Sequence, residues 1–218
     1  RIRVIGLCLS RFTAGGQVHL AGIGAARDRA RAAKKPVLTF ANAYVDDGMM
    51  LAAHASEVWV DPLGGAVVAG PGGDRLYYAG LLERLKVNAH VFRVGTYKSA
   101  IEPFIRNDMS AEAREDASAL YSALWEEWKA DVKKARPSAN LTLVTGQPVE
   151  WLAGARGDSA QAAKQAGLVD HIGDWVAFGN RVAKLAGPDD WKPGPGSFAH
   201  TELDPWLAAN KPGKPGKA

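Results

Sequence analysis

The sequence has 218 residues, of which 47% are hydrophobic and 23% charged, so it is long enough to bury a sizeable core. Its net charge is +4, from 27 basic and 23 acidic residues. Half of that excess lies in residues 192–218, where four lysines face only Glu202 and Asp204, so no basic face for nucleic acid is indicated. Cys8 is the only cysteine, which excludes an internal disulfide and a cysteine-built metal site.

The first third of the sequence predicts β-α-β units. Residues 1–9 have the apolar pattern of a strand, residues 17–35 that of a helix ended by Pro36, and residues 37–40 that of a second strand. A small-residue helix over residues 49–55 and a strand over residues 58–60 follow, with Asp61-Pro62 as a breaker. Such units imply parallel pairing of the strands.

The turn over residues 41–48 precedes the small-residue helix. The layout resembles crotonase-like and Clp-protease-like folds, in which this turn carries oxyanion-binding amides or a nucleophilic serine. Here it carries Asp46 and Asp47, which cannot form an acyl-enzyme and would oppose a developing negative charge. A hydrolytic centre at this turn is therefore disfavoured, and we expect at least one aspartate to cap the helix near Gly48.

A glycine-rich segment over residues 64–73 comes next. It lacks the Gly-Lys-Ser/Thr ending of a phosphate-binding loop. We therefore expect a short strand and a flexible loop, leading into an apolar-striped helix over residues 76–85.

The segment from Val91 to Phe104 contains the strongest candidate for a functional residue. The apolar run Val91–Val94 predicts a buried strand, and Gly95 allows a sharp turn, so Lys98 is expected at a strand end among apolar neighbours. Burial disfavours the ammonium form, which would lower the pKa of such a lysine and suit it to act as a general base. The alternative is an exposed lysine paired with Glu102 on a helix.

Residues 91–110, V-F-R-V-G-T-Y-K-S-A-I-E-P-F-I-R-N-D-M-S, closely resemble the motif around the catalytic lysine of the signal peptide peptidase A family, long form, also called protease IV. Weaker similarity extends over most of the chain. The resemblance implies that Lys98 is the general base of a Ser/Lys dyad in a serine peptidase that degrades cleaved signal peptides and other apolar peptides. It also implies a serine nucleophile in a following domain, a homo-oligomer (a tetramer), and a bacterial inner-membrane location facing the periplasm.

The remaining sequence predicts mainly helices. Ser110 is expected to cap a long amphipathic helix that ends at Pro137, with an apolar face broad enough to pack on another domain or subunit. Residues 141–144 suggest an extended piece, residues 159–166 a helix closed by Gly167, and residues 175–185 a last helix. The segment Leu168–Gly173 resembles a "G-L-V-D" segment of the family.

The predicted fold class is α/β, with crotonase/Clp-protease-like repeated β-β-α and β-α-β units and a long helix. Residues 1–186 form the single lysine-bearing domain, and residues 187–218 a Pro/Gly/Lys-rich linker in which Phe198 and Trp206 dock locally. No run approaches the roughly 20 apolar residues of a spanning helix, so the chain as given is expected to be soluble.

Other catalytic arrangements find little support. The five histidines show no zinc-ligand spacing, so neither a metal nor another cofactor is expected. His54 is interpreted as a packed or surface residue, and Ser56 and Ser99 lack a G-x-S-x-G context. Two alternatives stay open: a crotonase-like acyl-thioester enzyme, and a non-catalytic assembly domain.

Overall fold

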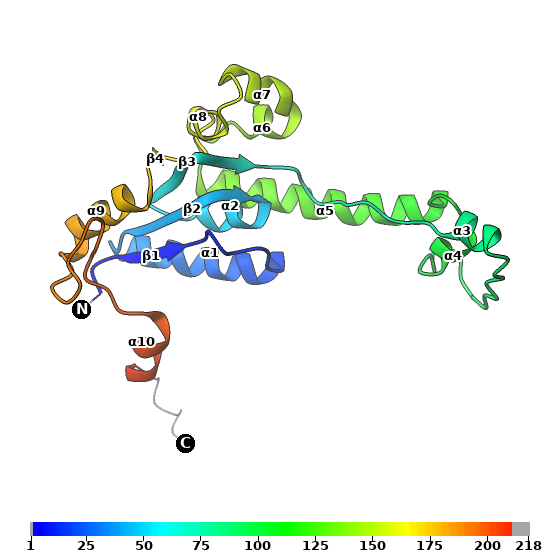
Figure 1. The fold of residues 1–218 in the computed structure, drawn as a ribbon, viewed down its shortest axis with the longest axis horizontal. Coiled ribbons are helices and arrows are strands. Elements are labelled where there is room, and N and C mark those ends of the chain that lie inside the picture. Colours follow the sequence, from blue (N-terminus) through cyan, green and yellow to red (C-terminus); the bar gives the residue numbers. More distant parts are fainter. Residues whose placement is uncertain (1, 211–218) are drawn as a thin grey trace.

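The sheet at the centre of the molecule has four parallel strands in the order β1-β2-β3-β4, as the computed structural model of residues 2–210 shows (Figure 1). Parallel pairing sets Ile5 opposite Val37, Leu38 opposite Glu57, and Trp59 opposite His171. The predicted mixed α/β class and the parallel strand pairing are thus confirmed. The strands are β1 (Ile5–Cys8), β2 (Val37–Val45), β3 (Glu57–Val67) and β4 (His171–Ile172).

Ten helices lie among the described residues, and several of them cover the two faces of the sheet (Figure 1). Alternate residues of β2 serve the two faces: Val37 and Ala41 belong to the large core with α2, α5 and α8, whereas Leu38 and Phe40 pack with α9. Burial on both faces is typical of a parallel strand. The helices are α1 (Gln17–Ala32), α2 (Asp46–Ala53), α3 (Ala79–Arg84), α4 (Glu102–Ile105), α5 (Ala111–Ala135), α6 (Leu141–Gly146), α7 (Pro148–Gly154), α8 (Ser159–Gln165), α9 (Trp175–Ala186) and α10 (Leu203–Ala209).

Strand β3 continues past the predicted breaker Asp61-Pro62. The register shifts between Ala41 and Ala43 of β2, after which pairing resumes opposite Gly65. The extra residues of β3 form a bulge, and a Cβ atom at Gly64 would stand only 1.5 Å from the carbonyl oxygen of Asn42. A proline is tolerated at such a bulge because it removes no ladder hydrogen bond there.

Three further expectations about secondary structure are wrong. Residues 91–94 form no strand, and residues 141–144 lie in the helix α6 because the side chain of Asn140 caps its first turn, accepting from the amide of Leu143. Helix α9 is not the last, since α10 lies within the predicted linker. Phe198 does pack against the α9 side of the sheet. The Pro/Gly/Lys run of residues 211–217 lies outside the described residues.

Helix α5 has 25 residues, about 37 Å at 1.5 Å per residue, and it extends from the body as an arm (Figure 1). Its C-terminal half is anchored in the core by Trp128 and Val132, both buried. Leu120 and Tyr121, nearer the tip, are exposed. Helices α3 and α4 lie at the far end of the arm, together with the loop between them (Figure 1). Use of the exposed apolar residues against another domain stays a prediction.

Within residues 2–210, no helix combines the length and the apolar character that a membrane-spanning segment requires.

An ion pair fastens α9 to the sheet. The guanidinium of Arg181 donates from Nε to both carboxylate oxygens of Glu57, each at 3.0 Å, and Nη2 adds a further bond. Trp59 Nε1 donates to the same carboxylate over 3.2 Å. These bonds, those from Arg181 first, hold the pKa of Glu57 below its ordinary value.

We expect Glu57→Gln to cost roughly 0.5–1 kcal/mol at pH 7, a modest figure because the pair is partly solvated. A carboxyl whose pKa is lowered by folding contributes stability above its unfolded pKa of about 4.3, and this contribution is lost as the pH falls through the folded pKa. The gap between wild type and variant should therefore shrink in acid. Urea denaturation at pH 7 and at about pH 4 measures it, and a gap independent of pH would contradict the assignment.

Candidate functional site

Lys98 lies at the tip of the arm, in the loop that joins α3 to α4, and its side chain is exposed. The expectation that a buried strand precedes it is wrong, since Phe92 is 96% exposed and Val94 87%. The reason is distance from the sheet, which lies at the other end of α5, so that this apolar run has no partner strand to complete its backbone hydrogen bonds (Figure 1). Desolvation of Lys98 by a strand end is therefore absent in this chain.

The turn at Gly95 is confirmed and sets the course of the lysine side chain. Its φ of 107° lies in the left-handed region, which favours glycine. Atoms Cγ, Cδ and Cε of Lys98 lie 3.7–3.9 Å from the place a Cβ atom would take on Gly95. The aliphatic part of Lys98 thus folds back across Gly95.

Side chains hold two successive backbone carbonyls, that of Lys98 and that of Ser99. Arg93 Nη1 donates to the carbonyl oxygen of Lys98 at 3.4 Å, and Arg75 Nη2 donates to that of Ser99 at 3.2 Å. The hydroxyl of Tyr97 donates to Glu115 on α5 over 3.2 Å, and the charge of Glu115 raises the pKa of Tyr97. The segment over residues 87–101, called the lysine loop from here on, is therefore connected to the long helix α5.

Glu102 does not form the exposed helical pair with Lys98 that was the alternative. Its side chain is 1% exposed and accepts from the backbone amide of Ser110 at 3.1 Å and from the Ser110 hydroxyl. These bonds, the hydroxyl first, lower the pKa of Glu102. Ser110 also caps α5 as predicted, because its Oγ accepts from the amide of Ala113 at 3.1 Å.

The two aspartates at the start of α2 pin loops and do not cap the helix, whose N-cap residue is Val45. Oδ1 of Asp46 accepts from the backbone amides of Ala69 and Gly70, both at 3.0 Å. Oδ2 of Asp47 accepts from the amide of Gly15 at 2.8 Å. The expected cap is therefore wrong. A pair of convergent amides is the kind of donor set that stabilises an oxyanion. In this chain the amides of Ala69 and Gly70 bind the carboxylate of Asp46 instead.

Comparison with known proteins identifies the family. Residues 29–188, from within α1 to just past α9, match the sequence model of peptidase family S49. The chain belongs to peptidase family S49. The S49 match includes the lysine motif, so the resemblance to the protease IV family is confirmed.

Two curated relatives of this S49 chain carry the name Protease 4. The protein from Salmonella typhi is 39% identical over 168 residues, covering 76% of this chain and 27% of the relative. The protein from Haemophilus influenzae is 32% identical over 189 residues, covering 86% of this chain and 31% of the relative. The S49 chain thus spans less than a third of the length of these relatives.

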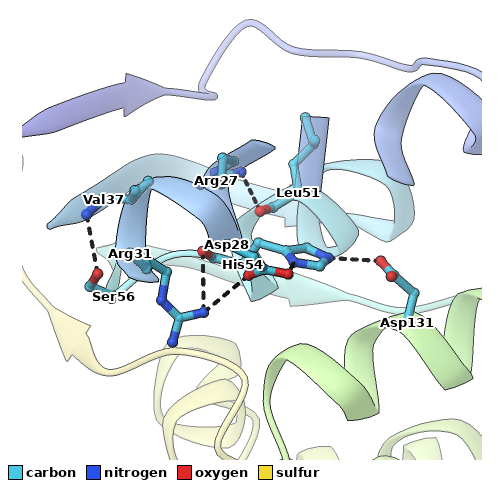
Figure 2. Close-up of polar contacts among 8 residues, drawn as sticks. All are labelled: Arg27, Asp28, Arg31, Val37, Leu51, His54, Ser56 and Asp131. Carbon is cyan, nitrogen blue, oxygen red and sulfur yellow. Dashed lines mark hydrogen bonds and ion pairs between the residues drawn. The ribbon is translucent and has the colours of Figure 1, made fainter. Parts of the chain in front are cut away.

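His54 and Ser56, at and just beyond the C-terminal end of α2, serve structure in this S49 chain. His54 is buried and packed, as one of its two interpretations had it, and both ring nitrogens face carboxylates, those of Asp28 and Asp131 (Figure 2). Ser56 Oγ accepts from the amide of Val37 at 3.1 Å. Within the described residues, no group of three or more histidine, cysteine or acidic side chains is placed to hold a metal ion.

Sequence reasoning missed two carboxylates of this region. The sequence pattern indicates Glu102 only as a surface partner of Lys98, and Asp46 as a helix cap or a charge that would oppose an oxyanion. For Glu102 the available signal is its spacing to Ser110. A serine hydroxyl at a helix start can donate to a carboxylate while its oxygen accepts from a backbone amide of the first turn. Asp46 bonds to amides 23 and 24 residues away, for which no local signal exists.

Proposed function

We propose that this S49 chain supplies Lys98 as the general base of a Ser/Lys-dyad serine peptidase, and that the nucleophilic serine lies in a following domain outside the chain. One observation carries the proposal: within the family match, the motif lysine is presented at the tip of an arm, exposed, with its stem ordered over Gly95 and its carbonyl held by Arg93. An exposed, ordered lysine suits completion of a site by a second domain.

The chemistry follows from the properties of the two side chains. A neutral lysine amine takes the proton of the serine hydroxyl as its oxygen attacks the peptide carbonyl. The peptide C–N bond then breaks, and the lysine ammonium gives that proton to the leaving amine. Water hydrolyses the resulting acyl-enzyme, which restores the serine hydroxyl and the neutral lysine. The reaction needs Nζ and Oγ within hydrogen-bond reach, roughly 2.6–3.2 Å. A domain that covers the arm would remove water from the amine and favour its neutral form.

Two sets of contacts support the proposal that the nucleophile lies in another domain. The turn that would carry a serine holds Asp46 and Asp47, whose carboxylates are engaged by backbone amides. Ser56 is engaged by the strand β2. Asp46 also occupies two convergent amides, those of Ala69 and Gly70, which supports a hydrolytic centre outside this turn.

The finer properties are proposals that rest on the family resemblance and on the relatives named Protease 4. They are a crotonase/Clp-protease-like fold with repeated units, a domain over residues 1–186 and a linker over 187–218. They extend to cleaved signal peptides and other apolar peptides as substrates, a tetramer, and a place at the bacterial inner membrane facing the periplasm. Exposed Phe92, Val94 and Tyr97 near Lys98 support an apolar partner or substrate.

We expect this chain alone not to hydrolyse an unstructured apolar peptide, and hydrolysis to appear when the serine-bearing remainder of the protein is added. A base without its nucleophile offers no covalent pathway. A fluorogenic peptide assay on the chain, the remainder and their mixture measures this, with a mixture containing Lys98→Ala as control. Turnover by the chain alone that survives Lys98→Ala would show that other residues do the chemistry.

A further inference from the structure

We propose that Glu102 is a positioning residue for Lys98, and that it fixes the lysine loop to the first turn of α5 through Ser110 and Arg93. The catalytic part of this inference rests on the proposed function. Its structural part, the anchoring of the loop, does not.

The burial of Glu102 is the first step. Within residues 2–210 it is the one acidic residue that is buried, at 1% exposure. A buried carboxylate is costly unless hydrogen-bond donors surround its oxygens. The donors are the amide and hydroxyl of Ser110 at the start of α5. Arg93 of the loop adds a positive charge without a hydrogen bond, since its Nη1 lies 4.0 Å from Oε1. Three segments therefore meet at one carboxylate.

The second step leads from this carboxylate to the lysine. The same Nη1 of Arg93 donates to the carbonyl oxygen of Lys98 at 3.4 Å, and the backbone amide of Glu102 donates to that of Ser99 at 3.0 Å. Residues 87–101 contain neither helix nor strand, so such contacts set the position of the loop. Glu102 thus reaches the Lys98 carbonyl through Arg93 and binds the next carbonyl, that of Ser99, with its own backbone amide, without needing to touch the amine of Lys98.

The third step concerns the far end of the network. Ser110 Oγ donates to Glu102 and accepts from the amide of Ala113, a buried residue of α5. The cap of the long helix and the anchor of the loop are therefore one hydroxyl. Because the other end of α5 packs into the core, the position of Lys98 relative to the core is set through Glu102, Ser110 and the helix.

Steady-state kinetics of the complete protein test the catalytic part. Glu102→Gln keeps the shape but loses the charge that attracts Ser110 and Arg93, and a misplacement of about 1 Å can cost roughly 100-fold in rate. We expect kcat to fall about 10- to 100-fold with KM within about twofold, since the buried Glu102 carboxylate is not exposed to contact the peptide itself. The matched control is Glu112→Gln, which removes the same charge from the first turn of α5, makes none of these contacts, and should leave both constants unchanged.

A conservative pair separates positioning from folding. Ser110→Ala should lower kcat about 10-fold, because both the hydroxyl bond and the cap are lost, and Ser110→Thr, which keeps the hydroxyl, should restore it. If Glu102→Gln failed to fold, this pair would still decide the matter. A Ser110→Ala protein with wild-type kcat, or a Thr variant as slow as the Ala variant, would overturn the proposal.

Hydrogen exchange gives a readout that does not depend on the reaction. In the complete protein, Glu102→Gln should speed exchange of the hydrogen-bonded amides of Ser99, Glu102 and Ser110 at least about 10-fold, and leave the core half of α5 unchanged. If Lys98→Ala retained activity, the proposed function would fall, yet this exchange result would still establish the anchor. Unchanged exchange in the loop would overturn the role of Glu102 even if Lys98 is the base.

Discussion

Replacing Lys98 with alanine in the complete protein is expected to lower kcat about 1000-fold or more, because a serine hydroxyl without its general base is a weak nucleophile. The fold should survive, since the side chain of Lys98 is exposed and the carbonyl that Arg93 binds is retained in alanine. Peptide affinity should stay within a few-fold of wild type, because Lys98 acts on the proton and not on the peptide side chains. Turnover of a fluorogenic peptide and binding to a variant lacking the nucleophile measure the two quantities.

Two further variants sharpen this result. Lys98→Arg keeps the positive charge but cannot accept a proton near neutral pH, so it should be as inactive as the alanine variant. Lys164→Ala removes an exposed lysine from α8, on the body, and should leave kcat unchanged. An alanine variant of Lys98 that kept a tenth of wild-type activity would exclude the dyad and favour an assembly role for the arm.

Much of the fold could be predicted because its signals are local. The periodic apolar residues predict the start of α1 at Gln17 correctly and, with Pro36, its end to within three residues, and Ser110 predicts the start of α5. The extension of β3 through Asp61-Pro62 could not be predicted in this way, because the strand resumes only where Gly65 meets Ala43 across the register shift. A proline next to an aspartate is a breaker on local grounds, and tertiary pairing overrides it.

In the candidate site, too, only the features with local signals could be predicted from the sequence. The motif identified Lys98, but the apolar run before it was misinterpreted as a strand, since four apolar residues without a neighbouring strand have nothing to pair with. The carboxylate of Glu102 and those that engage His54 find partners 8, 26 and 77 residues away, so only the folded chain shows them. Charged side chains with distant partners are therefore what the sequence conceals here.

His54→Ala is expected to lower the free energy of unfolding by about 3 kcal/mol, which for a chain of this size corresponds to roughly 6–12 °C in Tm. His54 is 3% exposed at the end of α2. Its Nδ1 lies 2.9 Å from Asp28 of α1, and its Nε2 lies 2.9 Å from Asp131 of α5 (Figure 2). Alanine would leave a cavity and two carboxylates without their partner. Both carboxylates are partly solvated, at 39% and 20% exposure, so water limits the cost.

Two glycines of α1 provide a matched test of the same contact without removing the histidine. A Cβ atom at Gly24 would stand 2.6 Å from His54 Nε2, whereas one at Gly22 would meet nothing within 4 Å. Gly24→Ala should therefore displace the ring and destabilise the chain by about 2 kcal/mol. Gly22→Ala should be neutral or stabilise it by up to about 1 kcal/mol, as expected for a helix interior.

Urea denaturation of the three variants measures these differences, and equal stability of Gly24→Ala and Gly22→Ala would contradict the assigned contact.

The same contact is also expected to affect the rate of the reaction. Asp131 belongs to the end of α5 that packs on the sheet, and the loop with Lys98 lies at the other end of the helix (Figure 1). Weakening the contact between His54 and Asp131 should therefore let α5, and Lys98 with it, change its orientation relative to the core. In the complete protein, Gly24→Ala is therefore expected to lower kcat at temperatures where the variant is still folded, and Gly22→Ala to leave it unchanged.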